Sequence, residues 1–345
     1  MRNFVVAIFA ATRTSRHRPS RSASWWLALV TVLFTAGSMP AGHAEGYPER
    51  TIKIVVPFPA GGPTDVAARL IAQSISNKLG QGVIVENHAG AGGRIGAKAV
   101  AGAAPDGYTL LLGGTNVNAI NGALYKDLGF DPINSFVPIG SICTDSMALA
   151  VGPTVAANTF QELVAYAKAN PGKLKYGAPP GIYTQFAPEY FKIKTGTDVL
   201  FVPYKGGAPA LTDVIGGHID MIFNNKSTVL AQLKDKDTRL RALAVTSAAR
   251  WAELPQTPTL EELGVSGFPP EVIFALLAPA GTPAAIAEKL NHAINDALRS
   301  PEIRANLESL GVDAKPGTTQ ELAAILAEQA RQWKTVIEVI GIKME

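Results

Sequence analysis

The sequence predicts an α/β protein built on largely parallel sheets. Short apolar runs rich in β-branched residues recur along the chain, as they do in buried strands. Most of these runs lead into a loop of glycine, proline or small polar residues, and apolar residues at helical spacing follow the loop. This alternation of strand, loop and helix is typical of parallel sheets covered by helices.

The first such unit spans residues 52–76. An apolar run at 52–56 is broken by three prolines and two glycines at 57–63, and a helical rhythm follows from Asp65. Pro63 suits the first helical position and Gly62 the cap. Because a helix start presents unpaired N–H groups and the positive end of its dipole, residues 60–64 are a candidate cradle for a carboxylate or phosphate. A tight turn that binds nothing fits this segment equally well.

The later units follow in order. Strands are expected at 82–87, 108–113, 136–142, 147–151, 175–177, 199–204, 219–223, 241–246 and 272–278, and helices at 97–103, 159–169, 210–215, 283–298, from 300 and at 319–340. Thr159 with Glu162 three residues later forms a capping box, and Thr319 is the expected cap of the last helix. No fixed-period repeat interrupts this order.

Three further loops resemble the first one, at residues 87–96, 177–185 and 204–209. Each follows an expected strand and opens an expected helix. The second loop invites comparison with dinucleotide-binding motifs, but Gly90, Gly92 and Gly96 miss the G-x-G-x-x-G spacing by one residue. We therefore expect a second helix N-terminus there, aimed at the same place as the first.

Composition indicates a globular protein without a nucleic-acid partner. The 345 residues are 47% hydrophobic and 17% charged, which excludes wholesale disorder. The formal net charge of +3 comes from the N-terminus, because residues 1–44 hold five arginines and no acid. The remainder carries 26 basic and 28 acidic side chains. Compositional support for nucleic-acid binding is therefore missing.

Residues 1–44 have the features of a secretory signal peptide. A basic region ending at Arg21 precedes an apolar run at 25–36, and Gly42-His43-Ala44 offers small residues for cleavage after Ala44. The apolar run falls short of the roughly 20 residues that span a bilayer, so a retained anchor is disfavoured. The expected location of the mature protein is the periplasm.

No catalytic, metal or cofactor site is expected. The single cysteine, Cys143, cannot form an internal disulfide and is expected to be a buried small hydrophobe. His88, His218 and His292 lie far apart and lack metal-ligand spacing. A secreted hydrolase is the distant alternative. It is disfavoured because the chain has no G-x-S-x-G motif and no nucleophile flanked by a histidine and an acid.

Four segments, in order along the chain, resemble the Bug (TctC-type) family of extracytoplasmic receptors of tripartite tricarboxylate transporters. They read VVPFPAGGPTDVAAR, VENHAGAGGRIGAKAVAGAAPDGYTLL, FVPYKGGAPALTDVIGGHIDMIF and LRALAVTSAARWAELPQTPTLEELG. The resemblance implies a two-lobed periplasmic-binding-protein fold, type II-like, with a mainly parallel sheet in each lobe and a ligand cleft between them. Lobe 1 would comprise residues 45–144 and 267–345, and lobe 2 residues 145–266.

The resemblance also implies a function. The protein would be a monomeric receptor that closes on a small organic mono- or dicarboxylate, aliphatic or aromatic. It would deliver this acid to two membrane subunits of a tripartite tricarboxylate transporter. A sensory receptor that presents the acid to a signalling partner would use the same closure, and the sequence leaves both open.

Family members hold ligand carboxylates largely by backbone amides and ordered water, which agrees with the cradle inferred above. Carried over by position, the implied ligand-binding residues of lobe 1 are Phe58, Ala60, Gly61, Gly62, Gly92, Gly93, Thr115 and Asn116. Those of lobe 2 are Gly181, Tyr183, Thr184, Gln185, Tyr204, Lys205 and Asn224. The chain departs from the usual family pattern at Gln185 with Phe186, at Asn224 and at His88.

Three side chains near these loops have competing interpretations. Asp65 is expected to serve the helix start rather than the ligand, since two negative groups at one helix start repel each other. Lys205 either offsets a carboxylate charge or is solvated. Tyr183 either stacks on an aromatic or long-chain acid, which we favour slightly, or packs outward.

Overall fold

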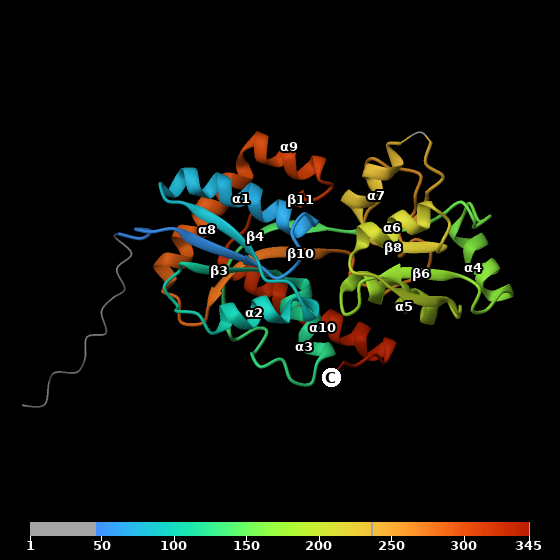
Figure 1. Cartoon of the computed structure of the whole chain (residues 1–345), viewed down its shortest axis with the longest axis horizontal. Coiled ribbons are helices and arrows are strands. Elements are labelled where there is room, and N and C mark those ends of the chain that lie inside the picture. The colour runs from blue at the N-terminus through green and yellow to red at the C-terminus, as the bar shows by residue number, and fades with distance from the viewer. Residues whose placement is uncertain (1–45, 236, 345) are drawn as a thin grey trace, which may run out of the picture. The chain divides into compact units, whose positions relative to one another are not determined.

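The computed structural model describes residues 46–235 and 237–344, which build two sheets flanked by helices (Figure 1). The expected signal peptide and its cleavage point after Ala44 lie outside these residues. No helix among the residues described is long and apolar enough to cross a membrane.

The first sheet has six strands in the order β11-β4-β10-β3-β1-β2. Their bounds are β1 (Ile52–Val56), β2 (Val83–Asn87), β3 (Thr109–Gly114), β4 (Phe136–Asp145), β10 (Val272–Pro279) and β11 (Asp313–Ala314). Strand β1 pairs in parallel with β2 and β3, as the βαβ pattern predicts. Strands β10 and β11 return from the C-terminal part of the chain and pair antiparallel with their neighbours.

The second sheet has five strands in the order β7-β6-β8-β5-β9. Their bounds are β5 (Met147–Val151), β6 (Lys175–Ala178), β7 (Leu200–Pro203), β8 (Met221–Asn225) and β9 (Arg241–Val245). Strand β6 runs parallel to β7 and β8, whereas β5 is antiparallel to both β8 and β9. The expectation of mainly parallel sheets is therefore wrong in this detail. The chain passes from the first sheet to the second between β4 and β5, and it returns between β9 and β10. Each of these four strands is antiparallel to its neighbours.

Helices follow most strands, as predicted. They are α1 (Pro63–Leu79), α2 (Arg94–Ala101), α3 (Asn121–Leu124), α4 (Phe160–Ala169), α5 (Tyr183–Thr195), α6 (Gly207–Ile215), α7 (Lys226–Leu233), α8 (Ala284–Arg299), α9 (Pro301–Ser309) and α10 (Thr319–Ile340). The capping box of Thr159 and Glu162 is present. The last helix is capped by Thr318 with Glu321, one residue before the expected cap. The elements that were not expected are α3, α7, β11, the short turn η1 (Ala91–Gly93) and the helical segment η2 (Thr115–Ile120). Loops were predicted at η1 and η2.

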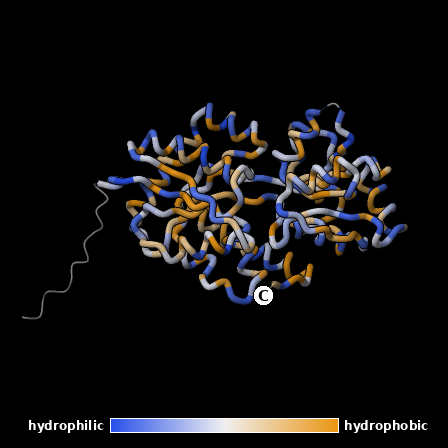
Figure 2. The backbone as a smooth tube through the Cα atoms, viewed as in Figure 1, coloured by the Kyte–Doolittle hydropathy of each residue, from blue (hydrophilic) through white to orange (hydrophobic). Residues whose placement is uncertain are grey.

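The hydrophobic core follows the strands, and Figure 2 shows the apolar residues gathered along them. Cys143 is buried, as expected for a small hydrophobe. Helix α10 packs on α5, which covers the second sheet, and also on η2 and β4 of the first sheet region. Its fully buried Trp333 lies edge-on to Phe186 and to Phe268, with ring centroids 6.5 and 5.4 Å apart. The C-terminal helix thus joins the packing around both sheets.

Candidate functional site

The loop between β1 and α1 is a built helix start. Gly62 caps α1 in an extended conformation, and Gly61 has a left-handed φ of 79° that favours glycine. The Gly61 N–H donates to Asp65 Oδ2 (2.9 Å), and Asn87 Nδ2 donates to Asp65 Oδ1 (2.9 Å). Asp65 therefore serves the helix start, as expected.

The surroundings of Asp65 keep its carboxyl group ionised. Burial raises the pKa of this carboxyl, but hydrogen bonds from Arg69, the Gly61 N–H and Asn87 outweigh burial and hold the pKa below its usual range. The carboxylate consequently stays ionised and keeps the loop in place. Ala60 and Gly61 remain exposed to solvent, although the Gly61 N–H is already bonded to Asp65.

The second glycine loop lies beside the first. A Cβ added at Gly93 would stand 3.4 Å from the Phe58 ring, so these two predicted residues are neighbours. The Gly92 carbonyl accepts from Asn116 Nδ2 (2.8 Å) and from Asn121 Nδ2 (3.2 Å). Thr115 Oγ1 accepts from the Ile273 N–H (2.8 Å) and donates to Gln329 (2.7 Å). Asn116 on η2 and Asn121 on α3 therefore hold this loop through its Gly92 carbonyl.

The loop that opens α5 approaches from the second sheet. Its Gly181 N–H donates to Gln185 Oε1 (2.7 Å), which closes the turn. A Cβ added at Gly92 would lie 3.3 Å from the Gly181 carbonyl oxygen, so loops of the two sheets meet here. The hydroxyl of Tyr125 lies within 3.5 Å of the same added atom and of one added at Gly181. This side chain was missed because its neighbours lie far away in the sequence.

Tyr183 points inward rather than toward solvent. Its side chain belongs to a residue only 9% exposed, and Asn225 Nδ2 donates to its hydroxyl (2.9 Å). The same Asn225 amide donates to Asp145 Oδ2. Burial raises the pKa of Tyr183, and the nearby Asp145 adds to the rise.

The remaining predicted residues of the second sheet lie around α6. Asn224 Nδ2 donates to the Gly207 carbonyl (3.1 Å) at the start of that helix. The Tyr204 hydroxyl donates to Asp213, and this hydrogen bond turns the phenol toward α6. Lys205 is exposed and makes no ion pair within the described part of the chain. Tyr204 contacts the start of the 177–185 segment: its N–H donates to the Ala178 carbonyl (3.0 Å), and a Cβ added at Gly177 would lie 2.8 Å from its ring.

Several buried polar atoms around these loops lack a partner. Among the residues described, no group bonds to Asn116 Oδ1, Thr184 Oγ1, Asn121 Oδ1 or Asp145 Oδ1. Native proteins seldom leave such atoms unpaired, so a ligand or ordered water is expected to reach them. Two of these side chains, Asn121 and Asp145, were not predicted. An acid closing an apolar strand was the available signal for Asp145.

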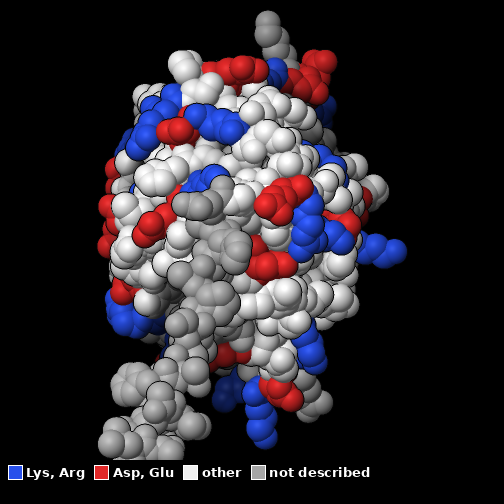
Figure 3. Space-filling model, turned by 90° about the vertical axis from the view of Figure 1, so that its left-hand side faces the viewer, with Lys and Arg blue, Asp and Glu red and all other residues white. Residues whose placement is uncertain are grey.

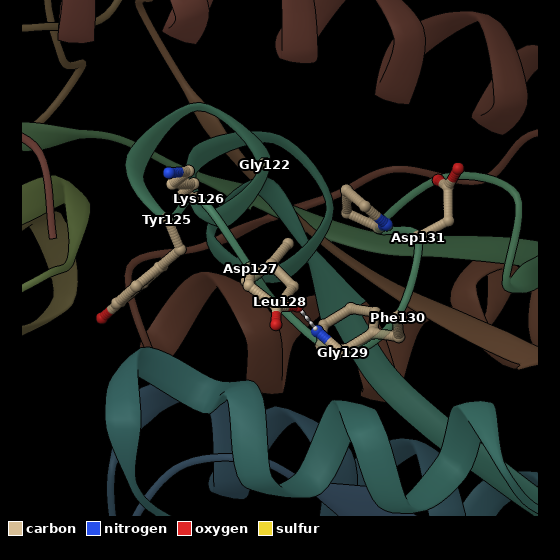
Figure 4. A pocket seen from close by; sticks show the side chains of 9 residues that line it. Gly122, Tyr125, Lys126, Asp127, Leu128, Gly129, Phe130 and Asp131 are labelled. Carbon is tan, nitrogen blue, oxygen red and sulfur yellow. Dashed lines mark hydrogen bonds between the residues drawn. The ribbon is translucent and has the colours of Figure 1, made fainter. Parts of the chain in front are cut away.

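Two hollows of the surface are lined by other residues. A shallow depression of about 500 Å³ is lined by Gly122 and by residues 125–132 (Figure 4). A second hollow of about 200 Å³ lies between residues 227–234 and 308–311, with Glu253 and Leu254. None of the predicted ligand-binding residues lines either hollow. One unpaired buried atom, Ser227 Oγ, belongs to a residue that lines the second hollow, whereas those of Asn116, Asn121 and Thr184 lie near the glycine loops.

Acidic and basic side chains are interspersed on the face shown in Figure 3, without a field of one sign. In residues 46–235 and 237–344, no group of three or more His, Cys, Asp or Glu side chains is placed to hold a metal ion.

Comparison with known proteins identifies the family. The family described as "Tripartite tricarboxylate transporter family receptor" (TctC) matches residues 67–342. The chain belongs to this family. The curated Protein BugT of Bordetella pertussis is 34% identical to this TctC-family receptor over 313 residues, which cover 90% of the chain and 95% of BugT.

Solved structures agree with the fold. The structure of R. palustris Rpa4515 with adipate has a TM-score of 0.80 at 34% identity, covering 86% of this chain and 99% of that one. MatC (Rpa3494) from Rhodopseudomonas palustris with bound malate has a TM-score of 0.77 at 30% identity, covering 84% and 100%. The expected periplasmic-binding-protein fold and TctC-type membership are confirmed. This receptor is a periplasmic solute-binding protein, not an enzyme.

Proposed function

We propose that this TctC-family receptor captures a small organic carboxylate between two lobes and delivers it to two membrane subunits of a tripartite transporter. The lobes would be residues 45–144 with 267–345, and residues 145–266. The observation that carries the proposal is the approach of Gly92 to Gly181, where loops from both sheets meet beside unpaired buried polar atoms. A ligand between them would touch both lobes at once.

The chemistry of the loops favours an anion. Helices α1 and α5 both begin within or beside these loops, and helix starts stabilise negative charge through free N–H groups and the dipole. The similar structures of Rpa4515 and MatC were solved with adipate and malate, both dicarboxylates. We therefore propose that one carboxylate is held at residues 58–62 and 92–93, and the far end of the ligand at residues 181–185 and Asn224.

The burial of Tyr183 favours an aliphatic ligand. Its ring is enclosed and its hydroxyl is hydrogen-bonded to Asn225, so little of the ring is free to stack on an aromatic acid. The lobe-2 contacts of Lys205 and Tyr204 are the weakest part of the proposed site, because one is exposed and the other is bonded to Asp213.

A thermal-shift screen tests the proposal. The chain from Glu45 onward is heated with mono- and dicarboxylates of increasing length, with aromatic acids, and with simple amines and neutral sugars as controls. We expect at least one aliphatic acid to raise the melting temperature, because a ligand that binds only the native state stabilises it. A shift with sugars but with none of the acids would contradict the carboxylate proposal.

A further inference from the structure

The C-terminal tail of the chain lies against the point where loops of the two sheets meet. After α10 the tail turns at Gly341, and the Met344 N–H donates to the Leu124 carbonyl (2.9 Å). Met344 also forms a β-bridge with Tyr125, the residue that follows the last turn of α3. The tail is therefore tied by its backbone to the end of α3.

Two side chains of this region reach the loop that opens α5. A Cβ added at Gly181 would lie 3.3 Å from the Tyr125 hydroxyl and 3.5 Å from Met344 Sδ. The same hydroxyl would lie 3.5 Å from a Cβ added at Gly92, in the loop before α2. Tyr125 and Met344 are both partly buried at this junction of the two loops.

Arg94 holds the Tyr125 ring in this position. Its guanidinium lies over the ring, 4.2 Å from the centroid, and donates to the Asp127 carbonyl (3.0 Å). A cation over an aromatic face is an attractive contact. In Figure 4 the Tyr125 side chain extends away from the labelled residues that follow it. The chain itself therefore positions the phenol, and the hydroxyl is directed at the Gly181 loop without help from a ligand.

These contacts join parts of the chain that separate when the proposed site opens. Tyr125 and Met344 are attached to α3, whereas Gly181 lies between β6 and α5 of the second sheet. The site proposed above lies between the loops 87–96 and 177–185, so a ligand held there leaves when these loops move apart. Such a movement would break the contacts of both side chains with Gly181 and expose the Met344 thioether to water.

We propose that Tyr125 and Met344 form a clasp that holds the 177–185 loop against the 87–96 loop and thereby slows ligand release. This inference rests on the proposed carboxylate-binding function and adds two positioning residues to it. Neither side chain needs to touch the acid, because the clasp acts on the equilibrium between the closed and the open arrangement of the loops. Its effect on affinity is therefore expected mainly in the rate of release.

Hydrogen exchange of the unliganded receptor tests the clasp without a ligand. The chain from Glu45 onward is compared with Tyr125→Phe, which keeps the ring, and with Met344→Ala, which removes the thioether. We expect both variants to exchange amide hydrogens faster in the 177–185 loop, because local opening controls exchange. Exchange in α1 and α8, which lie away from these contacts in the chain, should stay unchanged.

Ligand release tests the functional consequence. The probe is adipate, malate or whichever acid of the thermal-shift screen binds best, used in radioactive form and displaced by an excess of the unlabelled acid. Tyr125→Phe and Met344→Ala should each release it about 5-fold faster, as loss of a partly buried contact provides, with little change in the rate of binding. The matched controls are Tyr166→Phe, which removes an exposed hydroxyl on α4, and Lys343→Ala, which alters the tail beside Met344. Both controls should behave like the unaltered receptor.

Oxidation provides a probe of Met344 that leaves its backbone and length unchanged. Among the sulfur atoms of the described residues, those of Cys143, Met147 and Met221 are buried, whereas Met344 is partly exposed. Hydrogen peroxide transfers one oxygen atom to a thioether and leaves as water, so the sulfide is oxidised to a polar sulfoxide. Peroxide treatment should speed release from the unaltered receptor but not from Met344→Leu, which keeps an apolar side chain of similar volume without the sulfur.

The outcomes separate the clasp from the proposed function. If Tyr125→Phe and Met344→Ala match the unaltered receptor in loop exchange and in release, these contacts do not hold the loops and the inference is wrong. Faster exchange throughout the molecule, or an equal effect in the control variants, would also overturn it, because either result indicates a general loss of stability. If no acid binds, the carboxylate function fails and the role in release with it, while hydrogen exchange still decides whether the clasp holds the loop.

Discussion

Replacing Gly61 with valine should remove carboxylate binding from this receptor while leaving its fold in place. Gly61 has a φ of +79°, and a Cβ added there meets no atom within 4 Å. The valine side chain would therefore stand in open space above the start of α1, where the ligand carboxylate is proposed to lie. The fold bears only the left-handed backbone strain, about 1–2 kcal/mol for a non-glycine residue.

The loss of stability and the loss of ligand affinity in Gly61→Val have different expected sizes. Strain of this order lowers the melting temperature by about 2–4 °C per kcal/mol in a domain of 150–250 residues. Loss of a hydrogen bond to a charged group costs about 1.5–3 kcal/mol, or roughly 10- to 150-fold in Kd. A steric clash between the valine and the carboxylate adds to the loss of affinity.

Gly264→Val is the matched control for this substitution. Gly264 has a φ of +80°, and an added Cβ there also meets no atom within 4 Å. Both variants should lose similar stability in a thermal melt. In calorimetric titration with the best acid from the screen, only Gly61→Val should lose affinity. If both variants bind as tightly as the unaltered receptor, the ligand does not use the β1–α1 loop.

Two further predictions concern stability. Since hydrogen bonds hold the pKa of Asp65 below its usual range, its stabilisation should be complete above about pH 5 and be lost as the pH falls below about 4. In urea unfolding across this range, lowering the pH should reduce the free energy of unfolding less in Asp65→Asn than in the unaltered receptor. An equal reduction in both proteins would contradict this account. Trp333→Ala should cost about 3–5 kcal/mol in the same assay, because the indole is fully buried against Phe186 and Phe268. A cost below about 1 kcal/mol would show that this contact contributes little.

Local signals in the sequence predicted most of the elements correctly. The β1–α1 unit, the capping box at Thr159 and the helix opening at Pro301 all depend on neighbouring residues, whose spacing is visible in the chain. The family resemblance rests on the same local motifs and is confirmed by the match over residues 67–342. The division into lobes and the ligand-binding residues remain predictions.

Residues close together in the chain were sufficient to predict the α/β class, the glycine loops and the family of this receptor. The antiparallel pairing of β5 and β10, the approach of Gly92 to Gly181 and the burial of Asp145 could be seen only in the folded protein. These features arise from pairing across long separations, as between Asp145 and Asn225, which lie 80 residues apart. Such contacts leave no periodic pattern in the sequence, because they depend on how whole sheets pack and not on residues that are neighbours in the chain.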